Sequence, residues 1–191
     1  GKRERKDKNV FKIVRTEALT DAIYLMDVEA PRVAKNCLPG QFVIVRGSED
    51  GERIPLTICD YSREAGTITI VFQVVGAATE MMKNLKAGDS FTDFVGPLGR
   101  PSELVEEDLE TLKNKKILFV AGGVGTAPVY PQVKWLHEHG VAADVIIGGR
   151  SKELIILEEQ MKAVAGNLYI TTDDGSYGSK GVVTNEIQKL V

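Results

Sequence analysis

Short runs of alternating apolar and polar residues in the first half of the chain predict strands. The clearest run covers residues 67–75, where Ile68, Ile70, Phe72 and Val74 fall on one face and polar side chains fall on the other. This period of two is typical of a half-buried strand. Further short runs, separated by turn residues, occur at residues 11–15, 23–29, 42–46 and 91–95. Their spacing predicts a small antiparallel β-barrel or sandwich.

The hydrophobic pattern changes after the glycine- and proline-rich segment 96–101, which we interpret as a hinge. Beyond it, continuous apolar runs alternate with helical stretches, as in a parallel α/β sheet. The apolar runs cover residues 116–121, 145–147 and 168–172, and helices are expected up to residue 138 and at 153–163 and 184–190. We therefore predict an N-terminal antiparallel β-barrel domain over residues 10–98 and a C-terminal α/β parallel-sheet nucleotide-binding domain over residues 99–191.

The predicted α/β sheet has only three strands. Doubly wound nucleotide-binding sheets usually carry about five or six. The pattern therefore predicts an incomplete domain whose C-terminal strands are missing from this chain. An open sheet edge favours pairing with another chain, and together with the family resemblance described below it implies a heteromer.

Composition narrows the class of protein without identifying it. The 191 residues are 43% hydrophobic and 27% charged, which is ordinary for a folded chain and too apolar for intrinsic disorder. A net charge of −3 argues against nucleic-acid binding, and we interpret the basic residues 1–6 as a solvated arm. No apolar run approaches the ~18 residues of a membrane span, so no membrane insertion is expected. The two distant cysteines, Cys37 and Cys59, predict no metal site and favour a reducing, cytoplasmic location.

The strongest single motif is the glycine-rich segment 121–128, Ala-Gly-Gly-Val-Gly-Thr-Ala-Pro. It follows an apolar strand directly and precedes a helix. Glycines allow a sharp turn and a close approach of the backbone, and the free N–H groups of a helix N-terminus suit a diphosphate. The spacing is neither that of a phosphate loop nor the full dinucleotide fingerprint, since Pro128 stands at the last position. A tight turn without a ligand is the alternative.

Two weaker motifs lie in the barrel half. The first is Arg53-Ile54-Pro55-Leu56-Thr57, in which an arginine could hold a phosphate and a hydroxyl could bond a flat ring. A plain transition from loop to strand explains it equally well. The second is the glycine-led entry from Gly76 into a helix over residues 80–85, with Thr79 as its cap. A helix cap without a ligand is the alternative here.

Together these motifs resemble the ferredoxin–NADP reductase superfamily. The combination is an Arg-x-Pro-x-Thr segment, a glycine-entered helix, Gly-Pro-Leu-Gly, and a strand ending in Gly-Gly-x-Gly-Thr-Ala-Pro. The chain is most similar to the FAD-bearing small subunits of dihydroorotate dehydrogenase, sulfide dehydrogenase and NADH-dependent ferredoxin:NADP oxidoreductase. The stretches that carry this narrower resemblance are residues 30–34, 38–42, 53–58 and 148–154. The resemblance covers nearly the whole chain from residue 10.

The resemblance implies that the barrel binds FAD. Arg53 is then expected to contact the FAD diphosphate. Pro55, Leu56 and Thr57 are expected to line the isoalloxazine, with Thr57 near its reactive N5 as the catalytic residue. The other implied FAD-binding residues are Phe72, Gln73 and Val74, through their backbone, and Gly76 and Thr79.

The resemblance also implies that the α/β half binds a nicotinamide dinucleotide. Its diphosphate is expected at Gly122, Gly123, Gly125 and Thr126, and the cofactor is also expected to contact Gly149, Arg150 and Asp173. We predict NAD(H) in preference to NADP(H), because the carboxylates of Asp173 and Asp174 would repel a 2′-phosphate and could accept a ribose hydroxyl. Arg150 argues the other way, since a guanidinium can bind a phosphate.

The predicted function is flavin-dependent electron transfer between NAD(P)H, FAD and an iron–sulfur or partner acceptor. The expected partner is a larger iron–sulfur and flavin subunit or ferredoxin. Relatives with a 2Fe-2S cluster use a cysteine-rich C-terminal segment, so we expect a cluster only if such a segment exists beyond this chain. The alternative is a docking or regulatory module that keeps the fold without catalysis.

Overall fold

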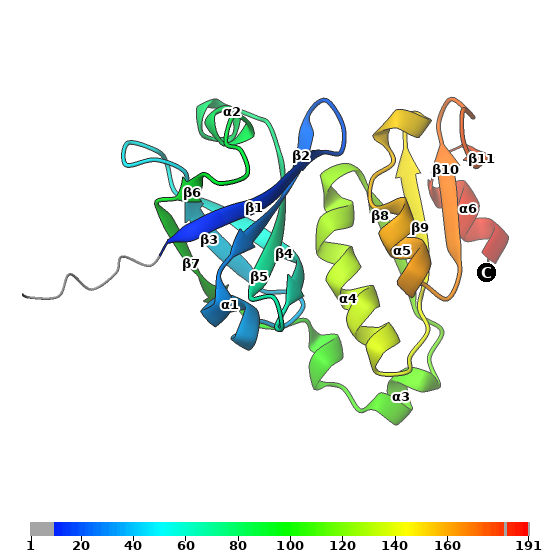
Figure 1. Cartoon of the computed structure of the whole chain (residues 1–191). Coiled ribbons are helices and arrows are strands. Elements are labelled where there is room, and N and C mark those ends of the chain that lie inside the picture. The colour runs from blue at the N-terminus through cyan, green and yellow to red at the C-terminus, as the bar shows by residue number, and fades with distance from the viewer. Residues whose placement is uncertain (1–9, 182, 191) are drawn as a thin grey trace, which may run out of the picture.

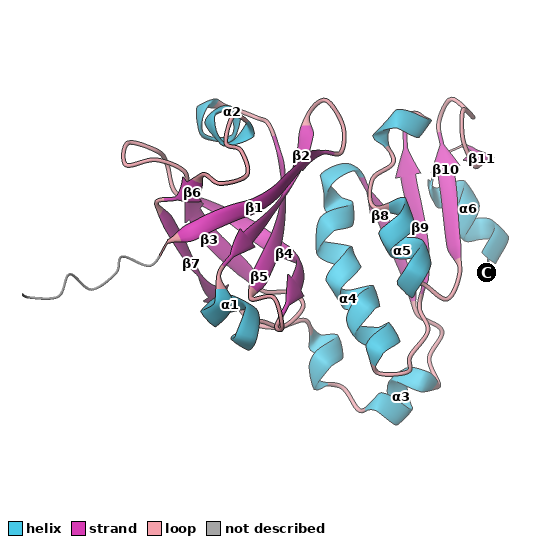
Figure 2. Ribbon diagram, in the orientation of Figure 1, coloured by secondary structure: helices cyan, strands magenta, loops and turns pink. Residues whose placement is uncertain are grey.

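The computed structural model describes residues 10–181 and 183–190 and contains two sheets side by side (Figure 1). The first is antiparallel, has seven strands and curves into a near-barrel, and the second is parallel and has four. Figure 2 shows most of the helices around the second sheet. The predicted fold class, a barrel followed by a parallel α/β half, is confirmed. The domain boundary between residues 98 and 99 remains a prediction, and the basic residues 1–6 lie outside the described part of the chain.

The near-barrel surrounds an apolar core. Its strands are β1 (Phe11–Ala18), β2 (Ile23–Glu29), β3 (Phe42–Arg46), β4 (Ile54–Ser62), β5 (Thr67–Gln73), β6 (Ser90–Phe91) and β7 (Asp93–Leu98), in the order β6-β1-β2-β5-β4-β3-β7. The alternation in β5 places Ile68, Ile70 and Phe72 in this core, each no more than 1% exposed. Val71 points to the opposite face and is also buried, because the second half of the molecule covers it.

Two short helices in the barrel half differ from the prediction. Pro31 begins helix α1 (Pro31–Asn36), which we did not predict because six residues are too few to show a helical period. Helix α2 (Ala77–Lys83) begins three residues earlier than predicted and is preceded by Gly76, whose φ is 137°. Thr79 is therefore not its N-cap. Its hydroxyl accepts from the backbone N–H of Val75 at 2.8 Å and donates to the carbonyl of Gly76 at 3.2 Å.

Strand pairing also extends further than the local pattern indicated. β4 pairs with β3 from Ile54, so the Arg53–Thr57 motif is mostly strand rather than loop. β7 pairs with β3 as far as Leu98, so the predicted hinge at residues 96–101 begins inside the sheet. Neither extension has a clear hydrophobic period, because Pro55 interrupts the first run and Gly96 and Pro97 interrupt the second.

The second sheet has one strand more than predicted. It contains β8 (Leu118–Gly122), β9 (Asp144–Gly149), β10 (Leu168–Thr172) and β11 (Ser179–Lys180), in the order β11-β10-β9-β8. Its helices are α3 (Leu109–Lys113), α4 (Thr126–Glu138), α5 (Glu158–Val164) and α6 (Val183–Leu190), with 3-10 turns at Glu103–Glu106, Gly123–Gly125 and Lys152–Leu154. β11 consists of two polar residues and leaves no apolar run. The predicted helix 153–163 begins only at Glu158, because Leu157 adopts a left-handed conformation with φ 59°.

The two halves share a packed interface. Leu25, Cys59 and Val71 on the outer face of the barrel belong to one buried cluster with Tyr130 and Val133 of α4. Apolar burial of this extent holds the two sheets in a defined orientation. An ion pair crosses the same interface, from the ammonium of Lys134 on α4 to the carboxylate of Asp60 on β4, at 2.7 Å.

Candidate functional site

The exposed face of the barrel brings the predicted flavin residues into rows across three strands. In the β4–β3–β7 register, Thr57 lies opposite Phe42 and Leu98, and Pro55 lies opposite Ile44 and Val95. These side chains alternate with inward-facing residues such as Val43 and Val45, which are fully buried. The outward face is partly apolar, and Val95 is 51% exposed. It is a surface suited to a flat ring.

A cluster of charged side chains, Arg46, Arg53 and Asp93, lies at one end of these rows. The Arg53 side chain is 58% exposed and donates from Nη2 to Asp93 Oδ2 at 2.9 Å. Arg46 binds the same carboxylate oxygen at 2.8 Å. The Nε of Arg46 is buried and has no acceptor among the described residues. Two guanidinium groups, one of them exposed, beside an apolar face fit a ligand that carries both a ring and an anion, as FAD does.

Other predicted flavin residues lie less directly on this face. The Leu56 side chain packs partly against the barrel core, and the Phe72 side chain is 1% exposed, so Phe72 can face a ligand only through its backbone. Gln73 is exposed at the end of β5, and Val74 packs partly against the core. Gly76 has open space where a Cβ would lie. The Thr79 hydroxyl bonds local backbone, as described above.

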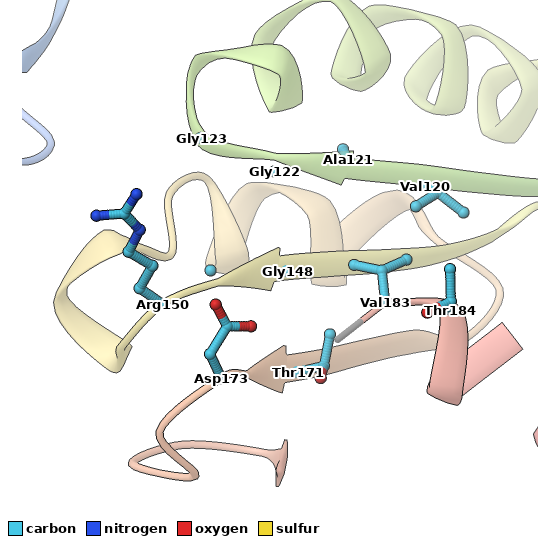
Figure 3. Close-up of a pocket in the computed structure, with 11 residues that line it drawn as sticks. Val120, Ala121, Gly122, Gly123, Gly148, Arg150, Thr171, Asp173, Val183 and Thr184 are labelled. Atoms are coloured by element: carbon cyan, nitrogen blue, oxygen red, sulfur yellow. The ribbon is translucent and has the colours of Figure 1, made fainter. Parts of the chain in front are cut away.

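A second concave site lies at the carboxyl ends of the parallel strands (Figure 3). It is a pocket of about 530 Å³. It is lined by Val120, Ala121, Gly122, Gly123, Gly148, Gly149, Arg150, Thr171, Asp173, Val183 and Thr184. Five predicted residues are among these: Gly122, Gly123, Gly149, Arg150 and Asp173. Ligands of open α/β sheets bind at this edge, so the pocket has the expected place in the fold.

The glycine turn shapes one wall of this pocket. A Cβ on Gly122 would lie 3.0 Å from the carbonyl oxygen of Gly148, so the two strands approach too closely for a larger residue. Gly123 has a φ of 53° and open space around its missing side chain. The turn leads into α4, whose first N–H groups and positive dipole end fit a diphosphate.

Two predicted residues of this motif do not line the pocket. Gly125 ends the turn at Gly123–Gly125, and Thr126 begins α4 with its side chain fully buried. The Thr126 hydroxyl has no hydrogen-bond partner among the described residues. Only the backbone of Thr126 can therefore contribute to a ligand site.

Sequence reasoning missed the part of the pocket that α6 supplies. A Cβ on Gly148 would lie 2.4 Å from a methyl of Val183, so α6 packs directly against β9 at this point. No local motif indicates this contact, because the two residues are far apart in the sequence. The one available sequence signal of this contact was the apolar residue at position 183, directly before the predicted helix 184–190.

Arg150 and Asp173 follow neighbouring strands at the rim of the pocket. Figure 3 shows the Arg150 guanidinium directed away from the Asp173 carboxylate, past the ends of the strands. The loop after β10 is internally bonded: Asp174 accepts from the backbone N–H of Ser176 at 2.9 Å. Hydrogen bonds from Ser176 lower the pKa of Asp174, which keeps this carboxyl ionised.

The glycine turn of the second site contacts the sheet that carries the first site. The turn at Gly123–Gly125 packs against β5 of the barrel, and Val124 belongs to the interface cluster. A ligand on the barrel face near β5 and one at the glycine turn would therefore be neighbours.

Within the described residues, no group of three or more His, Cys, Asp or Glu side chains is arranged to hold a metal. No helix of the described part is both long and apolar enough to cross a membrane.

Comparison with solved structures defines the fold class of the protein. A ferredoxin-NADP⁺ reductase from Plasmodium falciparum superposes with a TM-score of 0.71 at 17% identity, covering 95% of this chain and 78% of that chain, which shows the fold alone. An NADH-dependent reduced ferredoxin-NADP oxidoreductase, studied for flavin-based electron bifurcation, superposes with a TM-score of 0.84 at 38% identity. The match covers 97% of this chain and 64% of that chain. The protein thus has the ferredoxin reductase-like fold, with a barrel of the FAD-binding type and an NAD-binding type of α/β half.

Sequence comparison then gives the family. A dihydroorotate dehydrogenase B (NAD(+)) electron transfer subunit from Streptococcus pneumoniae is 32% identical over 182 residues, 94% of this chain and 70% of that protein. A homolog of this subunit from Thermotoga maritima is 40% identical over 178 residues, which are 93% of this chain and 60% of that protein. The chain belongs to the family of dihydroorotate dehydrogenase B electron transfer subunits, which are oxidoreductase components.

The similarity is broader than these two proteins. An uncharacterized protein in the adh 3′ region of Clostridium beijerinckii is 59% identical over 182 residues, which are 95% of this chain and 62% of that protein. The chain spans 60–63% of the length of the first three relatives it matches. No protein-family model matches the chain.

Proposed function

We propose that this chain carries electrons between a nicotinamide dinucleotide and a partner acceptor through FAD. One observation carries the proposal: the exposed barrel face with Arg53, Pro55 and Thr57 belongs to the same sheet as β5, against which the glycine turn of the pocket packs. When bound, FAD and the nicotinamide supply the hydride and single-electron chemistry. The residues of the chain orient the two cofactors and exclude water between them.

On the barrel, Arg53 binds the FAD diphosphate, and the outward-facing side chains of Pro55 and Thr57 lie against the isoalloxazine. The Thr57 hydroxyl hydrogen-bonds near N5 and is the proposed catalytic residue. The backbones of Leu56 and of Phe72, Gln73 and Val74 flank the ring and the ribityl chain. Gly76 leaves room for a phosphate oxygen at the entry to α2.

On the α/β half, the backbone N–H groups from Gly122 to Thr126 bind the diphosphate of the nicotinamide cofactor. Gly149 allows the cofactor to approach β9, and Arg150 and Asp173 lie on its adenosine side. The proposed domain boundary at residues 98 and 99 then separates the two cofactor-binding parts.

The FAD assignment is tested by spectrum and affinity. Bound oxidised flavin absorbs at about 450 nm, so the purified protein should be yellow after incubation with FAD. Arg53→Ala should weaken FAD binding by about 10- to 150-fold, because it removes a charge-assisted contact of about 1.5–3 kcal/mol. Arg15→Ala is the matched control, since Arg15 is also a half-exposed, ion-paired arginine of the barrel. Equal FAD affinity in both variants would exclude Arg53 from the site.

The role of Thr57 is tested separately. Thr57→Ala should retain FAD but change the rate of flavin reduction by NADH in rapid-mixing experiments. Identical spectra and identical reduction rates would remove Thr57 from the reacting centre.

We propose NAD(H) as the preferred cofactor, because the carboxylates of Asp173 and Asp174, which follow β10, would repel the 2′-phosphate of NADP(H). Asp173→Asn should narrow the preference, measured as the ratio of the NADH and NADPH dissociation constants by flavin bleaching. If NADPH bound about tenfold more tightly to the unaltered protein, a difference of about 1.4 kcal/mol, Arg150 would be the 2′-phosphate ligand instead.

The partner is a larger iron–sulfur and flavin subunit or ferredoxin, in a reducing cytoplasmic setting. A 2Fe-2S cluster is expected only with a cysteine-rich segment that this chain does not contain. The competing proposal is a docking or regulatory module. A protein that stays colourless with excess FAD yet still recovers its partner in pull-downs would favour that module.

A further inference from the structure

Arg46, Asp93 and Arg53 form a charged cluster at one end of the exposed barrel face. Arg46 ends β3 and lies directly opposite Asp93 of β7 in the strand register. Arg53 precedes β4 on the other side of β3. Both guanidinium groups reach the same oxygen, Asp93 Oδ2, at 2.8 Å and 2.9 Å. Arg46 and Asp93 lie in neighbouring strands and Arg53 directly precedes a third, so the sheet itself holds the three residues together.

The two arginines differ in their exposure. The Arg46 side chain is 18% exposed, whereas that of Arg53 is 58% exposed. Arg46 also donates from Nη1 to the backbone carbonyl of Glu49 at 2.9 Å, which fixes its position. The Glu49 carboxylate is 3.9 Å away and 79% exposed, so solvent screens it and Asp93 is the main counter-charge. Arg46 is thus the inner cation of the cluster and Arg53 is the outer one.

The charges of the cluster sum to +1, because two guanidinium groups face one carboxylate. Without Arg46, the pair of Arg53 and Asp93 would be neutral, and the Asp93 carboxylate would oppose any anion that approached Arg53. At separations of a few ångströms, such a charge changes the binding of an anion substantially.

We propose that Arg46 is a charge-compensating positioning residue of the flavin diphosphate site. It neutralises Asp93, and Asp93 in turn holds the Arg53 guanidinium at the barrel face through a single N–H group. Arg53 therefore keeps its net charge and its remaining N–H groups for the diphosphate. This inference rests on the proposed function, since it assigns a role toward the FAD that the function requires.

The test compares FAD with riboflavin, which has the same ring system but no phosphate. Dissociation constants are measured by quenching of flavin fluorescence for the unaltered chain and for Arg46→Gln, Asp93→Asn and the double variant. Arg46→Gln makes the cluster neutral and should weaken FAD binding about tenfold. The double variant restores the charge of +1, so its FAD affinity should return to within about threefold of the unaltered chain. Riboflavin affinity should stay constant throughout.

Two further variants make the result decisive. Asp93→Asn alone raises the charge to +2 and should bind FAD at least as tightly as the unaltered chain. Arg46→Lys keeps the charge and should retain FAD affinity, and constant riboflavin binding would show that both Arg46 variants are folded.

Three outcomes overturn the inference: unchanged FAD affinity in Arg46→Gln, no recovery in the double variant, or a parallel loss of riboflavin affinity. Failure of the proposed function looks different, because the unaltered chain would then bind neither flavin.

Discussion

The buried hydroxyl of Thr126 allows a sharp test of the nucleotide half. Thr126 is 0% exposed, and its Oγ1 has no hydrogen-bond partner among the described residues. A buried hydroxyl without a partner costs about 1–3 kcal/mol relative to its hydrated state. Thr126→Val replaces the hydroxyl with a methyl of similar shape, so it should raise the free energy of unfolding by about 1–2 kcal/mol. For a chain of this size, the melting temperature should rise by about 2–6 °C.

Thr172→Val is the matched control, because Thr172 is equally buried but fully bonded. Its hydroxyl donates to the carbonyl of Tyr177 at 2.7 Å and accepts from the N–H of Tyr177 at 3.2 Å. The same substitution there should lower stability by about 1–3 kcal/mol, since it leaves a backbone group unbonded. Urea titrations of both variants, followed by circular dichroism, give the two free energies.

The Thr126→Val variant also separates a backbone role of Thr126 in cofactor binding from a side-chain role. Because the hydroxyl is buried, Thr126→Val should leave the affinity for NADH within about twofold of the unaltered protein. A loss of stability in Thr126→Val, or a tenfold loss of NADH affinity, would refute the reasoning: the hydroxyl would then have a partner that the geometry does not show.

Two further predictions concern the interface and the barrel core. The ion pair of Lys134 and Asp60 crosses between the halves with side chains 30% and 29% exposed, so a double-mutant cycle with Lys134→Met and Asp60→Asn should give a coupling of about 0.5–1 kcal/mol in urea unfolding. A coupling near zero would mean that apolar packing alone orients the halves. Burial raises the pKa of the Cys37 thiol from 9.0 to about 11, so its protonated form stabilises the fold fully below pH 9.0, and this stability is lost as the pH rises toward 11. Cys37→Ala should therefore show a smaller fall in unfolding free energy over that range than the unaltered protein, and equal falls would contradict a buried thiol.

Local sequence patterns determined the elements that carry a strong period or a strong turn. The alternation along residues 67–75 identifies β5 and its inward face, because a strand turns successive side chains to opposite sides whatever its neighbours are. The apolar run before Gly122 and the glycines after it predict a strand, a tight turn and a helix start, and the structure has all three. The sequence failed where an element is too short or too polar to show a period, as in α1 and β11.

Tertiary structure decided which of these elements meet. The register of β3 with β4 and β7 aligns Thr57 and Pro55 on one exposed face and brings Arg46 to Asp93, a residue without any motif of its own. The contact of Val183 with Gly148 closes the nucleotide pocket in the same way. Periodicity is a property of neighbouring residues, so the chain alone determined which side chains share a face of one strand. Contacts between distant segments depend on strand order and register, which the burial of the whole core selects, so only the folded structure could place the charges of the two candidate sites.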